Sequence, residues 1–118
     1  MNRRILTGRC LCGAVTLRAE SAATTAHECH CTQCRRQSGH VWAYVSLPRA
    51  ALRLEGPVGT HAHTEKAVRG FCTICGSFLY WARNGADRID ISAGLLDRPT
   101  GLHLGKPSFA GNRGDYYA

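Results

Sequence analysis

The chain has 118 residues, of which 44% are hydrophobic, and this suits one globular domain over residues 1–118 and excludes extended disorder. The formal net charge is +7, but the basic residues are spread along the chain and form no run of like charges typical of a nucleic-acid-binding tail. No stretch approaches the roughly 18 apolar residues of a membrane span, and no apolar run marks a secretory signal, so we expect a cytoplasmic protein with no membrane contact.

The sequence pattern is that of short β-strands separated by turn residues. In chain order, strands are predicted over residues 4–9, 14–19, 26–30, 41–47, 52–54, 59–64, 67–71, 77–82 and 88–92. Residues 32–37 are predicted to form a short helical turn, and no segment has the pattern of a helix of about ten residues. The tail from Asp97 onwards is rich in Gly and Pro and is predicted to be a loop. We therefore expect an all-β domain with few or no long helices.

Seven cysteines lie in three clusters, which are the pair Cys10 and Cys12, the triplet Cys29, Cys31 and Cys34, and the pair Cys72 and Cys75. In a reducing compartment, clustered cysteines indicate metal binding or catalysis more often than disulfides. Thiolates are soft ligands that favour zinc, and a closed zinc site takes four ligands. The count therefore suggests one closed structural zinc and one zinc with three protein ligands and an open position.

The two outer pairs are predicted to form the closed site. Each pair is followed by a glycine, Gly13 or Gly76, which can take the positive φ that a metal-binding turn often needs. Their four sulfurs would join the start of the chain to a point about 60 residues later. A link of that length is an effective way to stabilise a small β-domain.

The middle triplet has no matching pair, so its zinc would keep a fourth position for water or substrate. The alternative is a site closed by a histidine, and His27, His30 and His40 all lie close in the sequence. His30 would point away from the cysteines on either side of it if the segment is extended, so His40 is the best candidate for that role. His61 and His63 share one face of a predicted strand and are interpreted as exposed residues.

The aromatic residues are interpreted as core and pocket wall rather than as a platform for stacking nucleic-acid bases. This group consists of Trp42, Tyr44, Phe71, Phe78, Tyr80 and Trp81. Trp42 and Tyr44 alternate along one predicted strand, so both would face the same side of a sheet.

Three segments closely resemble the glutathione-dependent formaldehyde-activating enzyme family, also called the centromere protein V domain family. They read GRCLCGAV over residues 8–15, CHCTQCRRQSG over 29–39 and RGFCTICGS over 69–77. The match is in the family's order and spans residues 8–97. The resemblance implies the β-tent fold, with a structural zinc on Cys10, Cys12, Cys72 and Cys75 and a catalytic zinc on Cys29, Cys31 and Cys34.

The resemblance also implies a reaction. The founding activity of the family is condensation of formaldehyde with glutathione to S-hydroxymethylglutathione, and it is classed as a carbon–sulfur lyase. The open zinc position would bind the thiol of glutathione, the co-substrate, and lower its pKa before it attacks an aldehyde. Arg35 and Arg36 would hold the tripeptide's carboxylates or remain solvated charges, and His40 would move protons. Residues 98–118 depart from the family's pattern, so substrate identity depends on whether this tail borders the pocket.

The alternative function is a non-catalytic zinc-binding module for a protein or nucleic-acid partner. The centromere protein V branch resembles this domain and works with chromosomes and microtubules. That branch is expected to carry an added disordered basic region, which this sequence does not contain. We therefore expect small-molecule thiol and aldehyde partners rather than nucleic acid, and the sequence is compatible with an oligomer.

Overall fold

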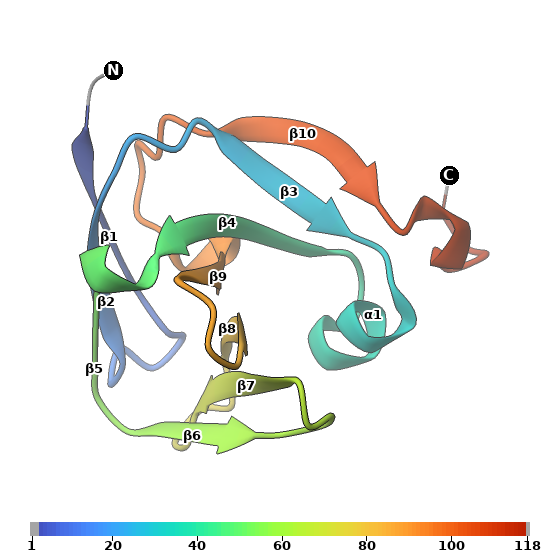
Figure 1. Cartoon of the computed structure of the whole chain (residues 1–118), viewed down its shortest axis with the longest axis horizontal. Helices are drawn as coiled ribbons and strands as arrows, with labels where there is room; N and C mark the ends of the chain where they lie inside the picture. Colours follow the sequence, from blue (N-terminus) through green and yellow to red (C-terminus); the bar gives the residue numbers. More distant parts are fainter. Residues whose placement is uncertain (1–2, 118) are drawn as a thin grey trace.

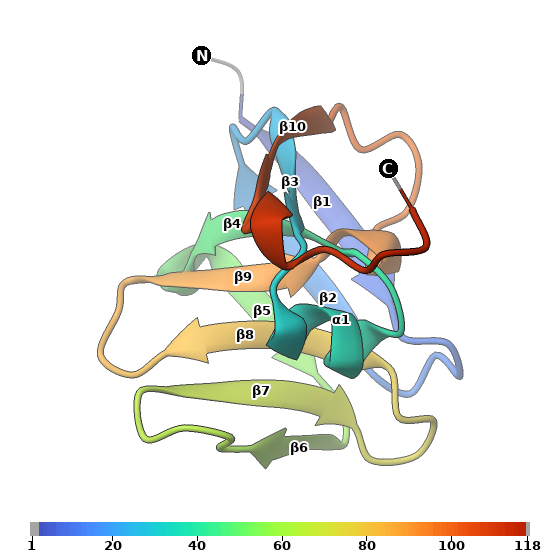
Figure 2. The ribbon, with the colours of Figure 1, turned by 90° about the vertical axis from the view of Figure 1, so that its right-hand side faces the viewer.

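The computed structural model describes residues 3–117, which fold into two β-sheets and one short α-helix. The small sheet has the strand order β1-β2-β5, and its strands are β1 (Arg4–Arg9), β2 (Thr16–Ser21) and β5 (Leu52–Glu55). The helix, α1 (Thr32–Ser38), lies on the far side of the large sheet from the small sheet (Figure 2). The prediction of an all-β fold without long helices is confirmed.

The large sheet has seven strands in the order β10-β3-β4-β9-β8-β7-β6 (Figure 1). Its strands are β3 (Thr25–Cys29), β4 (Trp42–Pro48), β6 (Val58–His61), β7 (Ala67–Cys72), β8 (Phe78–Arg83), β9 (Arg88–Ser92) and β10 (His103–Ser108). Short 3₁₀ turns are η1 (Arg49–Ala51), η2 (Ala93–Leu95) and η3 (Ala110–Asn112). No helix among the described residues is long and apolar enough to cross a membrane.

The main hydrophobic core lies between the two sheets. Alternate residues of β1 and β2 are buried, as in a sheet with one face on a core and the other in solvent. The buried residues of this core are Leu6, Leu17, Ala19, Val45, Leu47, Ala82, Ile89 and Ile91. Because successive side chains alternate across a strand, their neighbours Tyr44 and Asp90 point to the opposite face of the large sheet, where α1 lies.

The prediction that the tail is a loop is wrong for residues 103–108, which form β10. This strand pairs in parallel with β3, and its register shifts between Leu104 and Pro107. Both positions are exposed, so the strand shows no apolar alternation that a sequence pattern could detect. Pro107 is tolerated because β10 is an edge strand, where a missing backbone N–H costs no sheet pairing. The predicted strand over 59–64 is also shorter, since β6 ends at His61.

Gly8 is predicted to be essential for packing the segment after β9 against β1. Gly8 forms a bridge with Leu96, and a Cβ at Gly8 would collide with the backbone carbonyl of Leu95. Gly8→Ala should lower the free energy of unfolding by about 1–3 kcal/mol, because backbone cannot move aside as a side-chain tip can. Gly94→Ala is the control, since a Cβ there meets no atom within 4 Å. Equal denaturant midpoints for the two variants would contradict the prediction.

Candidate metal centres and the adjoining cleft

The loop between β1 and β2 and the loop between β7 and β8 form similar turns at the two outer cysteine pairs. In the β1–β2 loop, the Gly13 N–H donates to the Cys10 carbonyl over 3.1 Å, and the Val15 N–H donates to the Cys10 sulfur over 3.2 Å. In the β7–β8 loop, the Gly76 N–H donates to the Cys72 carbonyl over 2.9 Å. The φ angles of Gly13 and Gly76 are 82° and 80°, so both glycines occupy the left-handed region, as their sequence positions predict.

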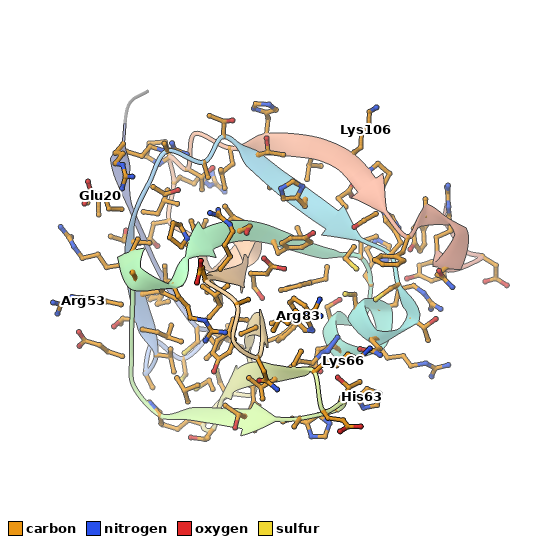
Figure 3. All side chains as sticks on the ribbon, in the orientation of Figure 1. Glu20, Arg53, His63, Lys66, Arg83 and Lys106 are labelled. Atoms are coloured by element: carbon orange, nitrogen blue, oxygen red, sulfur yellow. The ribbon has the colours of Figure 1, made fainter. Side chains whose placement is uncertain are left out.

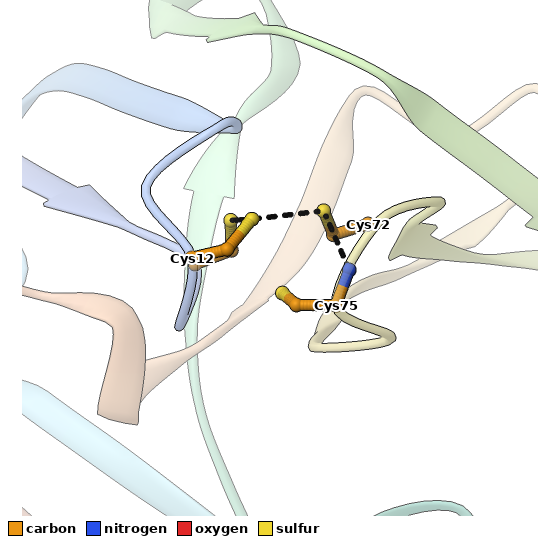
Figure 4. A group of neighbouring side chains, drawn as sticks. Cys12, Cys72 and Cys75 are labelled. Atoms are coloured by element: carbon orange, nitrogen blue, oxygen red, sulfur yellow. Dashed lines mark hydrogen bonds between the residues drawn. The ribbon is translucent and has the colours of Figure 1, made fainter.

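These turns bring the sulfurs of Cys10, Cys12, Cys72 and Cys75 within 4.8 Å of one another. The Sγ atoms of Cys10 and Cys12 are 3.6 Å apart, and those of Cys12 and Cys72 are 3.8 Å apart (Figure 4). Four thiolates around a tetrahedral zinc, each about 2.3 Å from the ion, would lie about 3.8 Å from one another. The donor set and its spacing therefore fit a closed tetrahedral metal site.

Ser77 links the two turns and favours the charged form of one cysteine. Its hydroxyl oxygen accepts a hydrogen bond from the Leu11 N–H over 3.0 Å and lies 3.2 Å from the Cys75 sulfur. Hydrogen bonds from the Ser77 hydroxyl and backbone lower the pKa of the Cys75 thiol to about 5. A thiolate is the form that binds metal, so Ser77 prepares Cys75 as a ligand.

The middle triplet lies where β3 passes into α1. Cys29 ends β3, Cys31 caps the helix by accepting a 3.3 Å hydrogen bond from the Cys34 N–H, and Cys34 lies in the first turn. The three sulfurs lie within 4.8 Å of one another, and no histidine or carboxylate among residues 3–117 joins their group. Burial and the two neighbouring sulfurs raise the pKa of Cys34, so three thiolates would need a cation between them. The set can supply three ligands to a metal ion.

A cleft of about 520 Å³ adjoins the triplet. It is lined by Cys29, Cys31, Thr32, Gln33, Cys34, Trp42, Tyr44, Arg69, Trp81, Asp90, Ser108, Phe109 and Asn112. Trp42 and Tyr44 stack with ring centroids 4.9 Å apart, and the Trp42 indole N–H donates to Ser92 over 2.8 Å. Trp42, Tyr44 and Trp81 therefore form part of the pocket wall, as interpreted from the sequence, whereas Phe71, Phe78 and Tyr80 do not line the cleft.

Arg69 and Asp90 line the cleft but were not predicted from the sequence as site residues, whereas Trp81, which pairs with both, was interpreted as core or pocket wall. Arg69, Trp81 and Asp90 are in register across β7, β8 and β9, so they project from the same face of the sheet. Burial raises the pKa of the Asp90 carboxyl. Ile89 and Ile91, on either side of Asp90 in β9, are buried in the main core, so Asp90 lies on the other face of the sheet.

None of the three predicted pocket residues, Arg35, Arg36 and His40, lines the cleft itself. The Arg35 guanidinium donates to the Asn112 carbonyl over 3.0 Å and does not line the cleft. His40 is exposed, and its ring Nδ1 lies 2.7 Å from the Tyr116 hydroxyl, so it is not among the donors grouped with the triplet. Arg36 lines a second hollow beside the cleft.

The tail forms part of the cleft wall. β10 places Ser108 beside Cys29, and the Ser108 hydroxyl donates to the Glu28 carbonyl over 3.0 Å. Beyond it, the Tyr117 hydroxyl lies 2.9 Å from Nδ1 of His30, a buried side chain whose Nε2 has no partner among the described residues. Phe109 also lines the cleft. Ser108 and Phe109 of the tail therefore border the site.

These features define a small all-β protein with two cysteine clusters that can hold metal ions, one of them beside an open cleft. The chain belongs to the family whose model is described as glutathione-dependent formaldehyde-activating enzyme, and this model matches residues 5–110. One of its relatives is described as a lyase.

That relative is an uncharacterized lyase of Schizosaccharomyces pombe, which is 34% identical over 91 residues. The match covers 75% of this chain and spans 66% of the relative's length. The fold is similar to the crystal structure of a Rhodobacter sphaeroides protein, with a TM-score of 0.65 and 23% identity over 78% of this chain and 88% of that one. The second similarity concerns the fold alone.

Proposed function

We propose that the protein is a cytoplasmic, zinc-dependent carbon–sulfur lyase that joins glutathione, or a related small thiol, to an aldehyde such as formaldehyde. The observation that supports it is the contrast between the two cysteine clusters. One has four sulfurs and needs no further ligand, whereas the other has three sulfurs at the edge of a cleft. Zinc bound by three protein ligands would offer an open position that lowers the pKa of a thiol.

The residues around the triplet have separable roles in this proposal. Cys29, Cys31 and Cys34 would hold the metal ion, and Trp42 and Trp81 provide aromatic surface beside it. Addition of a thiol to an aldehyde forms a C–S bond, removes the S–H proton and adds a proton to the carbonyl oxygen. Asp90, a half-buried carboxyl in the same cleft, is the candidate to accept and return that proton.

The first test is metal content and coordination with and without glutathione. The purified protein should contain two zinc ions per chain, one with four sulfur ligands and one with three, because each cluster supplies that many thiolates. X-ray absorption should show one added sulfur ligand when glutathione is present, and NMR should detect S-hydroxymethylglutathione when formaldehyde is added. Two sites that both have four protein ligands and do not respond to thiols would refute the enzyme and favour the non-catalytic module.

A further inference from the structure

A second hollow of about 490 Å³ lies beside the cleft and shares Thr32, Gln33 and Arg69 with it. We call it the basic hollow, and it is lined by Thr32, Gln33, Arg36, Gln37, His61, His63 and Arg69. Two arginines and two histidines contribute to it, and none of its lining residues is acidic. Its charge therefore suits an anion rather than an aldehyde or a neutral thiol.

Arg69 is the one buried residue among those that line this hollow. Its side chain is only 6% exposed, and its one hydrogen bond within residues 3–117 runs from Nη2 to the Gln33 side-chain oxygen over 3.0 Å. Among residues 3–117, no carboxylate forms a hydrogen bond with the Arg69 guanidinium. Burying a guanidinium is costly unless an anion pairs with it, and its remaining N–H groups can hold a carboxylate.

The rest of the hollow comes from two separate elements. Thr32, Gln33, Arg36 and Gln37 follow the spacing i, i+1, i+4, i+5, so they form one face of α1. His61 ends β6 and His63 lies in the loop after it, with ring centroids 5.9 Å apart. In Figure 3, His63 is labelled below α1, near the loop that follows β6. The hollow thus lies between the helix that carries Cys34 and an edge of the large sheet.

We propose that the basic hollow binds a carboxylate of the thiol substrate while the sulfur of that substrate lies at the cysteine triplet. This inference rests on the proposed function and narrows its substrate class to thiols that carry a carboxylate away from the sulfur. Gln33 lies between Cys31 and Cys34 in the sequence and bonds Arg69, so the two subsites share a wall. Arg69 and Arg36 also offset the negative charge that a further thiolate would bring to three thiolates and a divalent ion.

The test uses a probe that cannot react, namely S-methylglutathione, titrated calorimetrically into the zinc-loaded protein. Arg36→Gln is the main variant, because Arg36 is exposed and its replacement leaves the fold undisturbed. It should weaken binding by about 5- to 20-fold, and Arg69→Lys should weaken it by about 10-fold or more, since charged hydrogen bonds are lost. The diethyl ester of the probe should lose affinity to a similar extent. Arg53→Gln, an exposed change on β5 of the small sheet, is the matched control and should have no effect.

The outcomes separate this inference from the proposed function. Equal losses in Arg36→Gln and Arg53→Gln, or equal affinity for the ester and the acid, would overturn the carboxylate subsite even if the enzyme condenses thiols with aldehydes. Conversely, charge-dependent binding of the blocked probe with no turnover of any thiol would support the subsite and refute the lyase. A selective loss in Arg36→Gln together with turnover of glutathione but not of its ester would support both.

Discussion

Cys34→Ser should abolish condensation of thiol with aldehyde while the protein remains folded. Cys34 is 5% exposed and is one of only three sulfurs in its cluster. A serine hydroxyl has a pKa far above that of a thiol and is a poor ligand for a soft site, so the triplet would lose its metal. Loss of groups that merely orient ligands already costs about 10- to 100-fold, so loss of a ligand should lower kcat/KM by at least about 100-fold.

The fold should survive this change because the triplet lies apart from the main core. Cys29, Cys34 and Trp42 form their own buried cluster, separate from the residues between the two sheets. Circular dichroism should therefore be unchanged, while the zinc content falls from two ions to one. Ser38→Ala, on the same helix, keeps all three sulfurs and is the control. Full activity of Cys34→Ser with two zinc ions bound would disprove the catalytic role of the triplet.

Features that depend on short sequence distances were predictable. The two cysteine pairs with their glycines specify matching turns, because a positive φ immediately after the second sulfur is a local requirement. The helical turn over 32–37 corresponds to α1. The strand predicted over 88–92 corresponds to β9, because its apolar residues Ile89 and Ile91 are two positions apart and both face the core.

Features that depend on distant pairings were not predictable. β10 lies beside β3 although about 80 residues separate Ser108 from Glu28, and an exposed edge strand has no apolar pattern. Arg69 lies at the site because the register of β7, β8 and β9 aligns it with Asp90. The register between two strands cannot be predicted from the sequence of one strand alone. Arg35 and His40 are near Cys34 in the sequence, yet they contact the tail instead. A short sequence distance from Cys34 therefore did not predict which residues line the cleft.

The two cysteine clusters consequently differ in what they hold together. The four-sulfur cluster joins two loops, in which Cys12 and Cys72 are 60 positions apart, whereas the triplet comes from one continuous segment of β3 and α1. A metal ion that bridges distant segments contributes its binding free energy to folding, but a metal ion within one local segment contributes much less. A metal ion in the four-sulfur cluster should therefore be needed for the fold, whereas a metal ion in the triplet should be dispensable for the fold.

Cys75→Ser should cost the fold itself. Structural zinc contributes on the order of 10–16 kcal/mol in small zinc-binding peptides, and the total stability of a domain is about 5–15 kcal/mol, so loss of one of the four ligands should leave little native protein. The variant also loses the thiol whose pKa Ser77 lowers to about 5. Circular dichroism and thermal unfolding should show loss of the cooperative transition, and a strong chelator should do the same to the unaltered protein.

Ser77→Ala is the matched control for that result, because it keeps all four sulfurs and removes only the hydroxyl that contacts Cys75 and Leu11. It should cost about 1 kcal/mol, the usual contribution of a hydrogen bond. If Cys75→Ser instead melted like Ser77→Ala and kept the zinc of the triplet, the four-sulfur cluster would not be what fixes the β1–β2 loop to the β7–β8 loop. The stability would then have to come from the packing of Cys10, Val15, Cys72 and Leu79 alone, a buried cluster of only four side chains.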